Sequence, residues 1–241
     1  MIALGRFTLF VLAVGRAALR RPPAGQTLEH AWRIGVRSLP ILVLICAFIG
    51  TNLSLQGYSA FVPMGGERMV GLFVALAGVR EMAPILAASM VTAKAGTEMA
   101  SAIAVMRVRE QIDALEVMAV SPEWYLVVPR MLGIMLVMPA LTVISTFVMV
   151  FAAFCSAVFQ LDIPPADFVS YCEGAVTPFD VWFGMAKAVV FGAIIVLVSC
   201  YNGFQSAPGP RGVGAATNRA CVVSAVTCVI LNYFLSELAY G

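Results

Sequence analysis

Five runs of apolar residues, each long enough to cross a lipid bilayer as a helix, constrain this chain more than any other feature. A helix needs about 20 mostly apolar residues to cross roughly 30 Å of hydrocarbon. Runs of that length lie at 39–61, 70–93, 126–159, 179–201 and 220–238. Because backbone polar groups inside lipid must be satisfied internally, such runs predict transmembrane helices. We therefore expect an all-α integral membrane protein with about five transmembrane helices.

The composition agrees with a membrane location. Apolar residues make up 61% of the 241 residues and charged residues only 12%, whereas a soluble domain of this length needs more charge to cover its surface. The third run is too long for a perpendicular helix, so it either tilts or begins outside the hydrocarbon, and Pro139 offers a kink. The simplest organisation is one membrane domain over residues 1–241.

Lysine and arginine are distributed unevenly among the segments that flank the spans. The segment before the first span and the second and fourth connections hold Arg6, Arg16, Arg20, Arg21, Arg33, Arg37, Lys94, Arg107, Arg109, Arg130, Arg211 and Arg219. The first and third connections hold only Arg68, and the third is acidic. Because cationic loops resist translocation, we expect a cytoplasmic N-terminus and a periplasmic or external C-terminus.

The first 21 residues mix apolar side chains with arginines and end at Pro22-Pro23. A secretory signal is one alternative, but Arg16 interrupts its apolar core and no small-residue cleavage site follows before Arg20-Arg21. We expect residues 1–21 to form a helix in the inner membrane interface, with its arginines among anionic head groups.

A short amphipathic segment follows the second span. Val108, Ile112 and Leu115 recur at spacings of three and four, acidic side chains occupy the other face, and Pro122 ends the pattern. The pattern predicts a cytoplasmic helix over residues 107–119. One interpretation is an interfacial helix stabilised by its own charges. A mostly acidic face suits a protein groove better than an anionic lipid surface, so we favour docking on a partner.

Three charged residues, Arg80, Glu81 and Lys187, stand out because they lie well away from the ends of predicted spans. Each costs roughly 2.5 to 3.5 kcal/mol at a helix centre unless it is paired or hydrated. Pro84 has no amide hydrogen and leaves a carbonyl free one turn earlier. Two interpretations stay open: an ion pair between helices, such as Glu81 with Lys187, or a polar patch that lines a cavity for a lipid head group.

Two spans carry small or weakly polar residues at a spacing of four. These are Gly184, Ala188 and Gly192 in the fourth span, and Ser224, Cys228, Asn232 and Ser236 in the fifth. Such stripes are typical of helix packing within membranes, so a structural role is favoured over ligand binding.

The sequence gives little support for enzymatic chemistry. It contains no Gly-x-x-x-x-Gly-Lys-Ser/Thr phosphate loop, no His-Glu-x-x-His and no Gly-x-Ser-x-Gly. His30 is the only histidine, and the six cysteines include no Cys-x-x-Cys pair. We therefore expect no catalytic residue, metal site, cofactor or nucleic-acid partner for this chain.

Several motifs occur in one order along the chain. They are Gln56-Gly57-Tyr58, Arg80-Glu81-Met82-Ala83-Pro84, the run from Glu110 to Pro122, Pro129-Arg130, the segment from Lys187 to Gly192, Tyr201-Asn202-Gly203 and the segment from Gly212 to Arg219. In this order and spacing they resemble the MlaE/YrbE permeases of the MCE lipid-transport systems. The resemblance covers nearly the whole chain, and residues 93–98 depart from the usual Gly-Arg-x-Gly pattern of that family.

The resemblance implies the permease subunit of an ATP-driven lipid transporter in the cytoplasmic membrane. Such a subunit would form a dimer, of identical chains or paralogues, and would bind a cytoplasmic MlaF-like ATPase that holds the ATP. It would also bind a membrane-anchored MlaD-like MCE protein that passes lipid through a channel. Residues 110–116 would form the coupling helix, through Glu110, Gln111, Asp113, Leu115 and Glu116. The lipid pocket would lie at the dimer interface, with substrate-binding residues Tyr58, Arg80, Glu81 and Lys187.

Two other classes of function stay open. An ion-coupled secondary transporter would use Glu81 and Lys187 as titrating groups, but it predicts an internal repeat that five spans do not show. A scaffold that only recruits partners would leave the cost of three intramembrane charges unexplained. We therefore favour the lipid permease.

Overall fold

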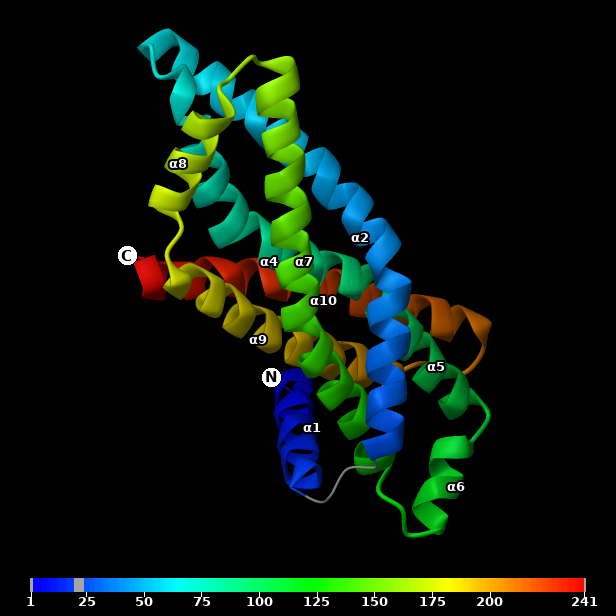
Figure 1. Cartoon of the computed structure of the whole chain (residues 1–241). Coiled ribbons are helices and arrows are strands. Elements are labelled where there is room, and N and C mark those ends of the chain that lie inside the picture. Colours follow the sequence, from blue (N-terminus) through cyan, green and yellow to red (C-terminus); the bar gives the residue numbers. More distant parts are fainter. Residues whose placement is uncertain (1, 20–23, 241) are drawn as a thin grey trace. The chain divides into compact units, whose positions relative to one another are not determined.

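The computed structural model describes residues 2–19 and 24–240, and within these residues the chain is helical with no strand (Figure 1). The α-helices are α1 (Ile2–Ala18), α2 (Ala24–Phe61), α3 (Val70–Phe73), α4 (Ala83–Val91), α5 (Thr97–Val108), α6 (Gln111–Val117), α7 (Val128–Gln160), α8 (Pro165–Ala175), α9 (Pro178–Phe204) and α10 (Pro210–Tyr240). Short 3-10 helices η1 (Val62–Met64) and η2 (Glu67–Met69) and π-helical segments η3 (Val74–Met82), η4 (Thr92–Gly96) and η5 (Glu123–Val127) join them.

Among the described residues, five helical segments are long and apolar enough to cross a membrane, which confirms the expected fold class. They are Gly25–Met64, Glu67–Val108, Glu123–Gln160, Pro178–Phe204 and Pro210–Tyr240. Each contains one of the apolar runs and extends beyond it, because the helices continue into more polar sequence at their ends. The third begins at Glu123, and Pro139 lies inside the continuous helix α7.

The chain forms two compact units, and each draws on segments distant in sequence. The first unit comprises Met1–Val36, Val91–Val137 and Val189–Leu231; the second comprises Arg37–Met90, Met138–Ala188 and Asn232–Gly241. Buried apolar side chains fill both, for example Ile103, Ile134 and Ile195 in the first unit and Leu42 and Met149 in the second. Burial of such side chains is the main favourable term inside each unit.

In the first unit, α1 is anchored by aromatic side chains. The Phe7 ring lies 5.2 Å from the Tyr201 ring in an edge-on arrangement, and the Phe10 ring lies 5.7 Å from that of Phe204. Leu9 and Leu12 are exposed. A helix with aromatic anchors and exposed leucines fits the expected interfacial helix, whose location in the membrane interface stays a prediction.

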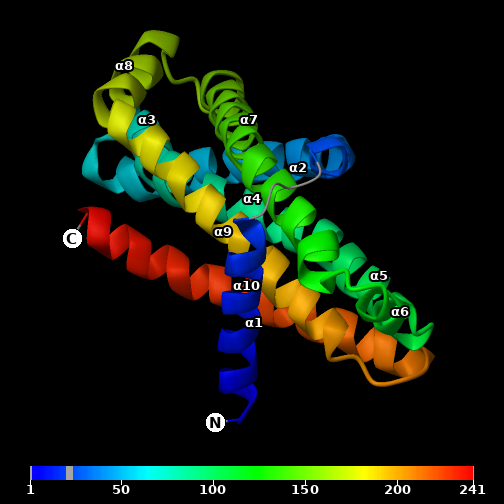
Figure 2. The same cartoon turned by 90° about the horizontal axis from the view of Figure 1, so that it is seen from below.

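In the second unit, two glycines allow helix backbones to touch. A side chain at Gly50 would collide with the backbone of Met149, so α2 and α7 approach closely there. A side chain at Gly71 would collide with the backbone of Phe168, which places α3 directly against α8 (Figure 2). These close contacts hold together the elements that build the candidate site.

Candidate functional site

Seven polar side chains of the second unit form a group that we call the charge cluster. They are Arg80, Glu81, Asp180, Lys187, Asn232, Ser236 and Tyr240. Three elements supply them: η3, the first turns of α9, and the end of α10.

A local distortion of the helix places Arg80 and Glu81. They lie in the π-helical segment η3, where the amide of Ala83 bonds to the carbonyl of Gly78 five residues earlier. Pro84 cannot donate to the carbonyl of Arg80. The Nζ atom of Lys187 donates to that carbonyl oxygen at 3.3 Å, so the carbonyl that the sequence predicted to be free holds a buried lysine.

Arg80 and Asp180 form a two-point ion pair. The distances are 3.0 Å from Nε to Oδ1 and 3.2 Å from Nη2 to Oδ2. The Asp180 side chain is only 1% exposed and also accepts hydrogen bonds from the Thr177 amide and hydroxyl and from the Tyr240 hydroxyl. Arg80 has a further acceptor in the Ala175 carbonyl. Charge-assisted bonds of this kind hold a carboxylate firmly in place.

Glu81 and Lys187 form the second ion pair, as one interpretation of the sequence anticipated. Lys187 Nζ lies 3.5 Å from Glu81 Oε1 and donates to Ser236 Oγ at 2.6 Å. The other carboxylate oxygen of Glu81 accepts from Asn232 Nδ2 at 2.8 Å and from Ser236 Oγ at 2.9 Å. Two members of the weakly polar stripe in the fifth span therefore bind Glu81.

The charge cluster is electrically neutral, because two cations face two carboxylates. Aromatic rings complete its surroundings: Arg80 Cζ lies 4.8 Å from the centroid of the Tyr240 ring, and Lys187 Nζ lies 5.1 Å from that of Phe183. Lys187 is fully buried, whereas the side chains of Arg80 and Glu81 are 26% and 37% exposed. Only these last two charged members are open to a ligand.

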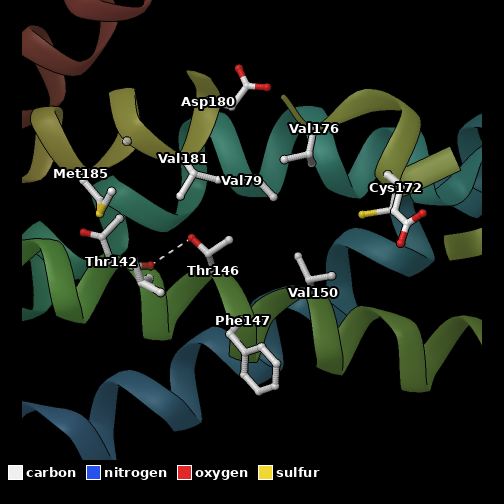
Figure 3. Close-up of a pocket in the computed structure, with 13 residues that line it drawn as sticks. Val79, Thr142, Thr146, Phe147, Val150, Cys172, Val176, Asp180, Val181 and Met185 are labelled. Carbon is white, nitrogen blue, oxygen red and sulfur yellow. Dashed lines mark hydrogen bonds between the residues drawn. The ribbon is translucent and has the colours of Figure 1, made fainter. Parts of the chain in front are cut away.

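An apolar pocket of about 380 Å³ lies beside the cluster in the same unit (Figure 3). Its walls come from η3, α7, α8, α9 and the residues between α8 and α9: Val79, Thr142, Val143, Thr146, Phe147, Val150, Cys172, Glu173, Val176, Asp180, Val181, Gly184 and Met185. The hydroxyls of Thr142 and Thr146 bond to carbonyls of their own helix, so they do not make the pocket polar. A cavity of this size and character suits an acyl chain.

The pocket and the charge cluster share one residue, Asp180. Figure 3 shows its carboxylate turned away from Val79 and Thr146, and this carboxylate binds Arg80. Asp180 was not among the residues singled out in the sequence. The pattern Thr177-Pro178-Phe179-Asp180 is a helix-capping box, in which the side chain of the third helical residue accepts a hydrogen bond from the amide of the capping residue. This pattern is the sequence signal by which Asp180 could have been found.

The four proposed substrate-binding residues divide into two groups. Arg80, Glu81 and Lys187 are brought together. Tyr58 is half-buried on α2 and makes no hydrogen bond to these three within the described part of the chain. None of the four contributes to the apolar pocket as the described residues define it.

The segment expected to be one helix over 107–119 is divided in the structure. Arg107 and Val108 end α5, and Glu110 adopts a left-handed conformation with φ 57° before α6 begins (Figures 1 and 2). The sequence pattern missed this turn because its spacing continues across it. Glu110, Gln111, Asp113 and Glu116 are exposed, Leu115 is half-buried and Ile112 is buried. α6 therefore presents an acidic, accessible surface.

The five candidate spans of the described residues define a multi-pass membrane protein. Residues 27–238 match the family model described as permease MlaE, so the chain belongs to the MlaE permease family. A probable ABC transporter permease protein of Rickettsia felis is 36% identical over 240 residues, which cover 99% of this chain and 92% of that protein. The expected family is confirmed, and the chain is a transmembrane permease.

Two further relatives have more specific names. The intermembrane phospholipid transport system permease protein MlaE of Haemophilus influenzae is 30% identical over 243 residues, 99% of this chain and 92% of the relative. The chloroplastic protein TRIGALACTOSYLDIACYLGLYCEROL 1 of Arabidopsis thaliana is 33% identical over 217 residues, 89% of this chain and 61% of the relative.

Proposed function

We propose that the chain is the permease subunit of an ATP-driven transporter that moves phospholipid or a related lipid between the cytoplasmic membrane and an MCE-protein channel. The observation that carries this proposal is the apolar pocket of the second unit, which is large enough for part of an acyl chain. The names of the Rickettsia and Haemophilus relatives support ATP-driven transport and a phospholipid cargo.

The proposed division of labour in the second unit follows from exposure. The acyl chain occupies the apolar pocket, and the head group contacts the exposed edges of Arg80 and Glu81. Lys187 is fully buried and contributes by holding Glu81. Tyr58 is proposed to contact lipid at the dimer interface.

The proposed partners are a second permease chain, an MlaF-like ATPase in the cytoplasm and an MlaD-like MCE protein. The ATPase binds the ATP, so this chain needs no cofactor. α6 docks on the ATPase through Glu110, Gln111, Asp113, Leu115 and Glu116, in the orientation that places the N-terminus in the cytoplasm. Closure of the ATPase pair would then displace α6 and switch the permease between two states.

Filling the pocket tests the proposal. Val181 lines the pocket and is 39% exposed, whereas Val190 lies on the same helix at 40% exposure outside it. We expect Val181→Trp to lose most of the lipid that copurifies in mild detergent, while Val190→Trp retains it. Mass spectrometry of extracted lipid measures both. Equal lipid content in the two variants would contradict the assignment of the pocket.

The ion-coupled alternative makes a different demand on Glu81 and Lys187, because both would have to exchange protons during transport. Four hydrogen bonds and one ion pair hold these side chains, an arrangement that favours fixed charges. Lipid transport by the reconstituted chain under a proton gradient, without ATP or ATPase, would support the alternative instead.

A further inference from the structure

A second pocket, of about 120 Å³, lies in the first unit among α2, η4, α5 and α7. Its polar wall consists of His30, Arg33, Glu98 and Arg130, and Ala102 contributes to its apolar wall. We call it the basic pocket. The apolar pocket of the second unit shares none of these residues.

A close contact between two helices builds the basic pocket. Gly133 lies one turn after Arg130 on α7, and a Cβ atom there would lie 3.0 Å from the Thr27 carbonyl and 3.1 Å from the Ala31 amide. A Cβ atom there would require the backbones of α2 and α7 to move apart by a few tenths of an ångström. Gly133 therefore brings the turn of α2 that carries His30 against the turn of α7 that carries Arg130.

The charges of the basic pocket do not cancel. Arg33 and Glu98 form an ion pair, which leaves the positive charge of Arg130 without a carboxylate in the pocket wall. The Nη1 atom of Arg130 is buried and has no hydrogen-bond partner among the described residues. The side chain also has a hydrogen bond with the thiol of Cys200, a weak acceptor that supplies no compensating charge. A guanidinium keeps its charge at any working pH, so a buried donor of this kind calls for an anionic acceptor.

We propose that the basic pocket binds a phosphate group. The cavity is far smaller than the roughly 300 to 1,000 Å³ of pockets for drug-sized ligands, so it suits a small anion rather than a whole lipid. Arg130 would donate to the phosphate oxygens, and Arg33 and His30 would add donors from the opposite wall. The phosphate could belong to a lipid head group or be free inorganic phosphate. This proposal is independent of the function assigned to the apolar pocket.

The test uses the purified full chain in a phosphate-free, non-ionic detergent. Native mass spectrometry measures retained lipid after exchange into phosphatidylglycerol or diacylglycerol, which lacks a phosphate. Thermal unfolding is followed with inorganic phosphate or chloride at equal ionic strength. Arg130→Gln removes the unpaired donor. Ala102→Leu fills the pocket and leaves every charge in place. Arg219→Gln, an exposed site on α10 in the same unit, is the matched control.

We expect both pocket variants to weaken anion binding by about tenfold or more. Arg130→Gln removes a charge-assisted hydrogen bond, Ala102→Leu excludes the anion from the cavity, and the control should match the wild type. A head-group site retains phosphatidylglycerol over diacylglycerol and releases it to added phosphate. A free-phosphate site shows the phosphate-specific thermal shift alone. Ala102→Leu decides the matter if Arg130→Gln fails to fold. Anion binding that ignores both pocket variants, or that Arg219→Gln weakens equally, would overturn the proposal.

Discussion

The charge cluster of the second unit and the basic pocket of the first unit both gather charged side chains, but they differ in how completely those charges are satisfied. In the cluster, each carboxylate has a cation and further donors, although Arg80 Nε and Asn232 Oδ1 make no hydrogen bond among the described residues. In the basic pocket, Arg130 keeps a buried donor without a partner among the described residues. An intramembrane charge therefore does not by itself mark a ligand site. A buried charge that has no opposite charge beside it is the better criterion.

The largest expected effect comes from breaking one ion pair of the cluster. Glu81→Ala leaves the fully buried Lys187 without its carboxylate. Loss of one partner of a fully buried pair costs about 3 to 5 kcal/mol, and the 37% exposure of Glu81 lowers the cost from that range. The double variant Glu81→Ala, Lys187→Ala should recover much of this loss, because no charge stays stranded. Steric trapping in detergent measures the free energy of unfolding.

The same unit supplies the control. Arg68 and Asp167 form an ion pair at 3.3 Å, with the arginine side chain 71% exposed. Such a pair contributes about 0 to 1 kcal/mol, so Asp167→Ala should change stability little. A stabilising ion pair between Glu81 and Lys187 would be contradicted if Glu81→Ala lowered the free energy of unfolding no more than this control. It would also be contradicted if the double variant lowered that free energy more than the single one.

A second expected effect concerns Tyr240. Its hydroxyl donates to Asp180 Oδ1 at 2.8 Å, and Tyr240→Phe removes this bond while it keeps the ring beside Arg80. Hydrogen bonds to charged groups contribute about 1.5 to 3 kcal/mol, so stability should fall by that order. Tyr233→Phe, at an exposed position on the same helix, is the control and should leave stability unchanged. An equal loss of stability in both variants would show that the hydrogen bond from Tyr240 to Asp180 makes no specific contribution.

The sequence alone predicted the fold class, but it did not show which groups pair with all of the charged side chains. Apolar run length depends only on local composition, and the five spans follow from it. The Glu81–Lys187 pair was also within reach, since few groups inside the membrane can neutralise either charge. Asp180 was missed because it lies at the very start of the fourth apolar run, and the sequence does not reveal that Arg80 reaches the first turn of α9.

The interruption of the 107–119 helix had a different cause. The left-handed turn at Glu110 uses a non-glycine residue and preserves the apolar spacing, so neither composition nor periodicity indicates it. The basic pocket depends on a contact between α2 and α7 at Gly133, and separations of about 100 residues leave no local pattern. The apolar pocket could not be predicted from the sequence either, because Val, Thr and Met are ordinary residues of any span.

α6 offers the opposite case, a charged surface whose loss should leave folding nearly intact. Glu110, Asp113 and Glu116 are exposed, so their replacement by Lys should change stability by only about 0.5 kcal/mol. The same triple variant should lose the copurifying ATPase, because a positive surface replaces the acidic one. Glu29→Lys, at an exposed acidic residue of α2, is the control. Retention of the ATPase at wild-type stoichiometry would exclude docking through α6.

The smallest effect is a change in labelling rate at Cys172, a residue that lines the apolar pocket and lies outside the spans. Burial, with a further contribution from Glu173, raises the pKa of this thiol above its usual value. A raised pKa leaves less of the reactive thiolate at neutral pH. Labelling of intact cells by a membrane-impermeant maleimide should therefore be slow and rise about tenfold per pH unit while the pH stays below that pKa.

The matched comparison is Ser170→Cys in a Cys172→Ser background. Position 170 lies on the same helix, is exposed and does not line the pocket. It should react faster than Cys172, and added short-chain phospholipid should slow only Cys172, because lipid in the pocket covers that thiol. A cysteine introduced by Asp113→Cys on α6 should stay unlabelled in intact cells if α6 is cytoplasmic. Labelling at position 113 but not at 172 would reverse the proposed orientation. Equal protection at positions 170 and 172 would contradict the proposal that lipid occupies the pocket.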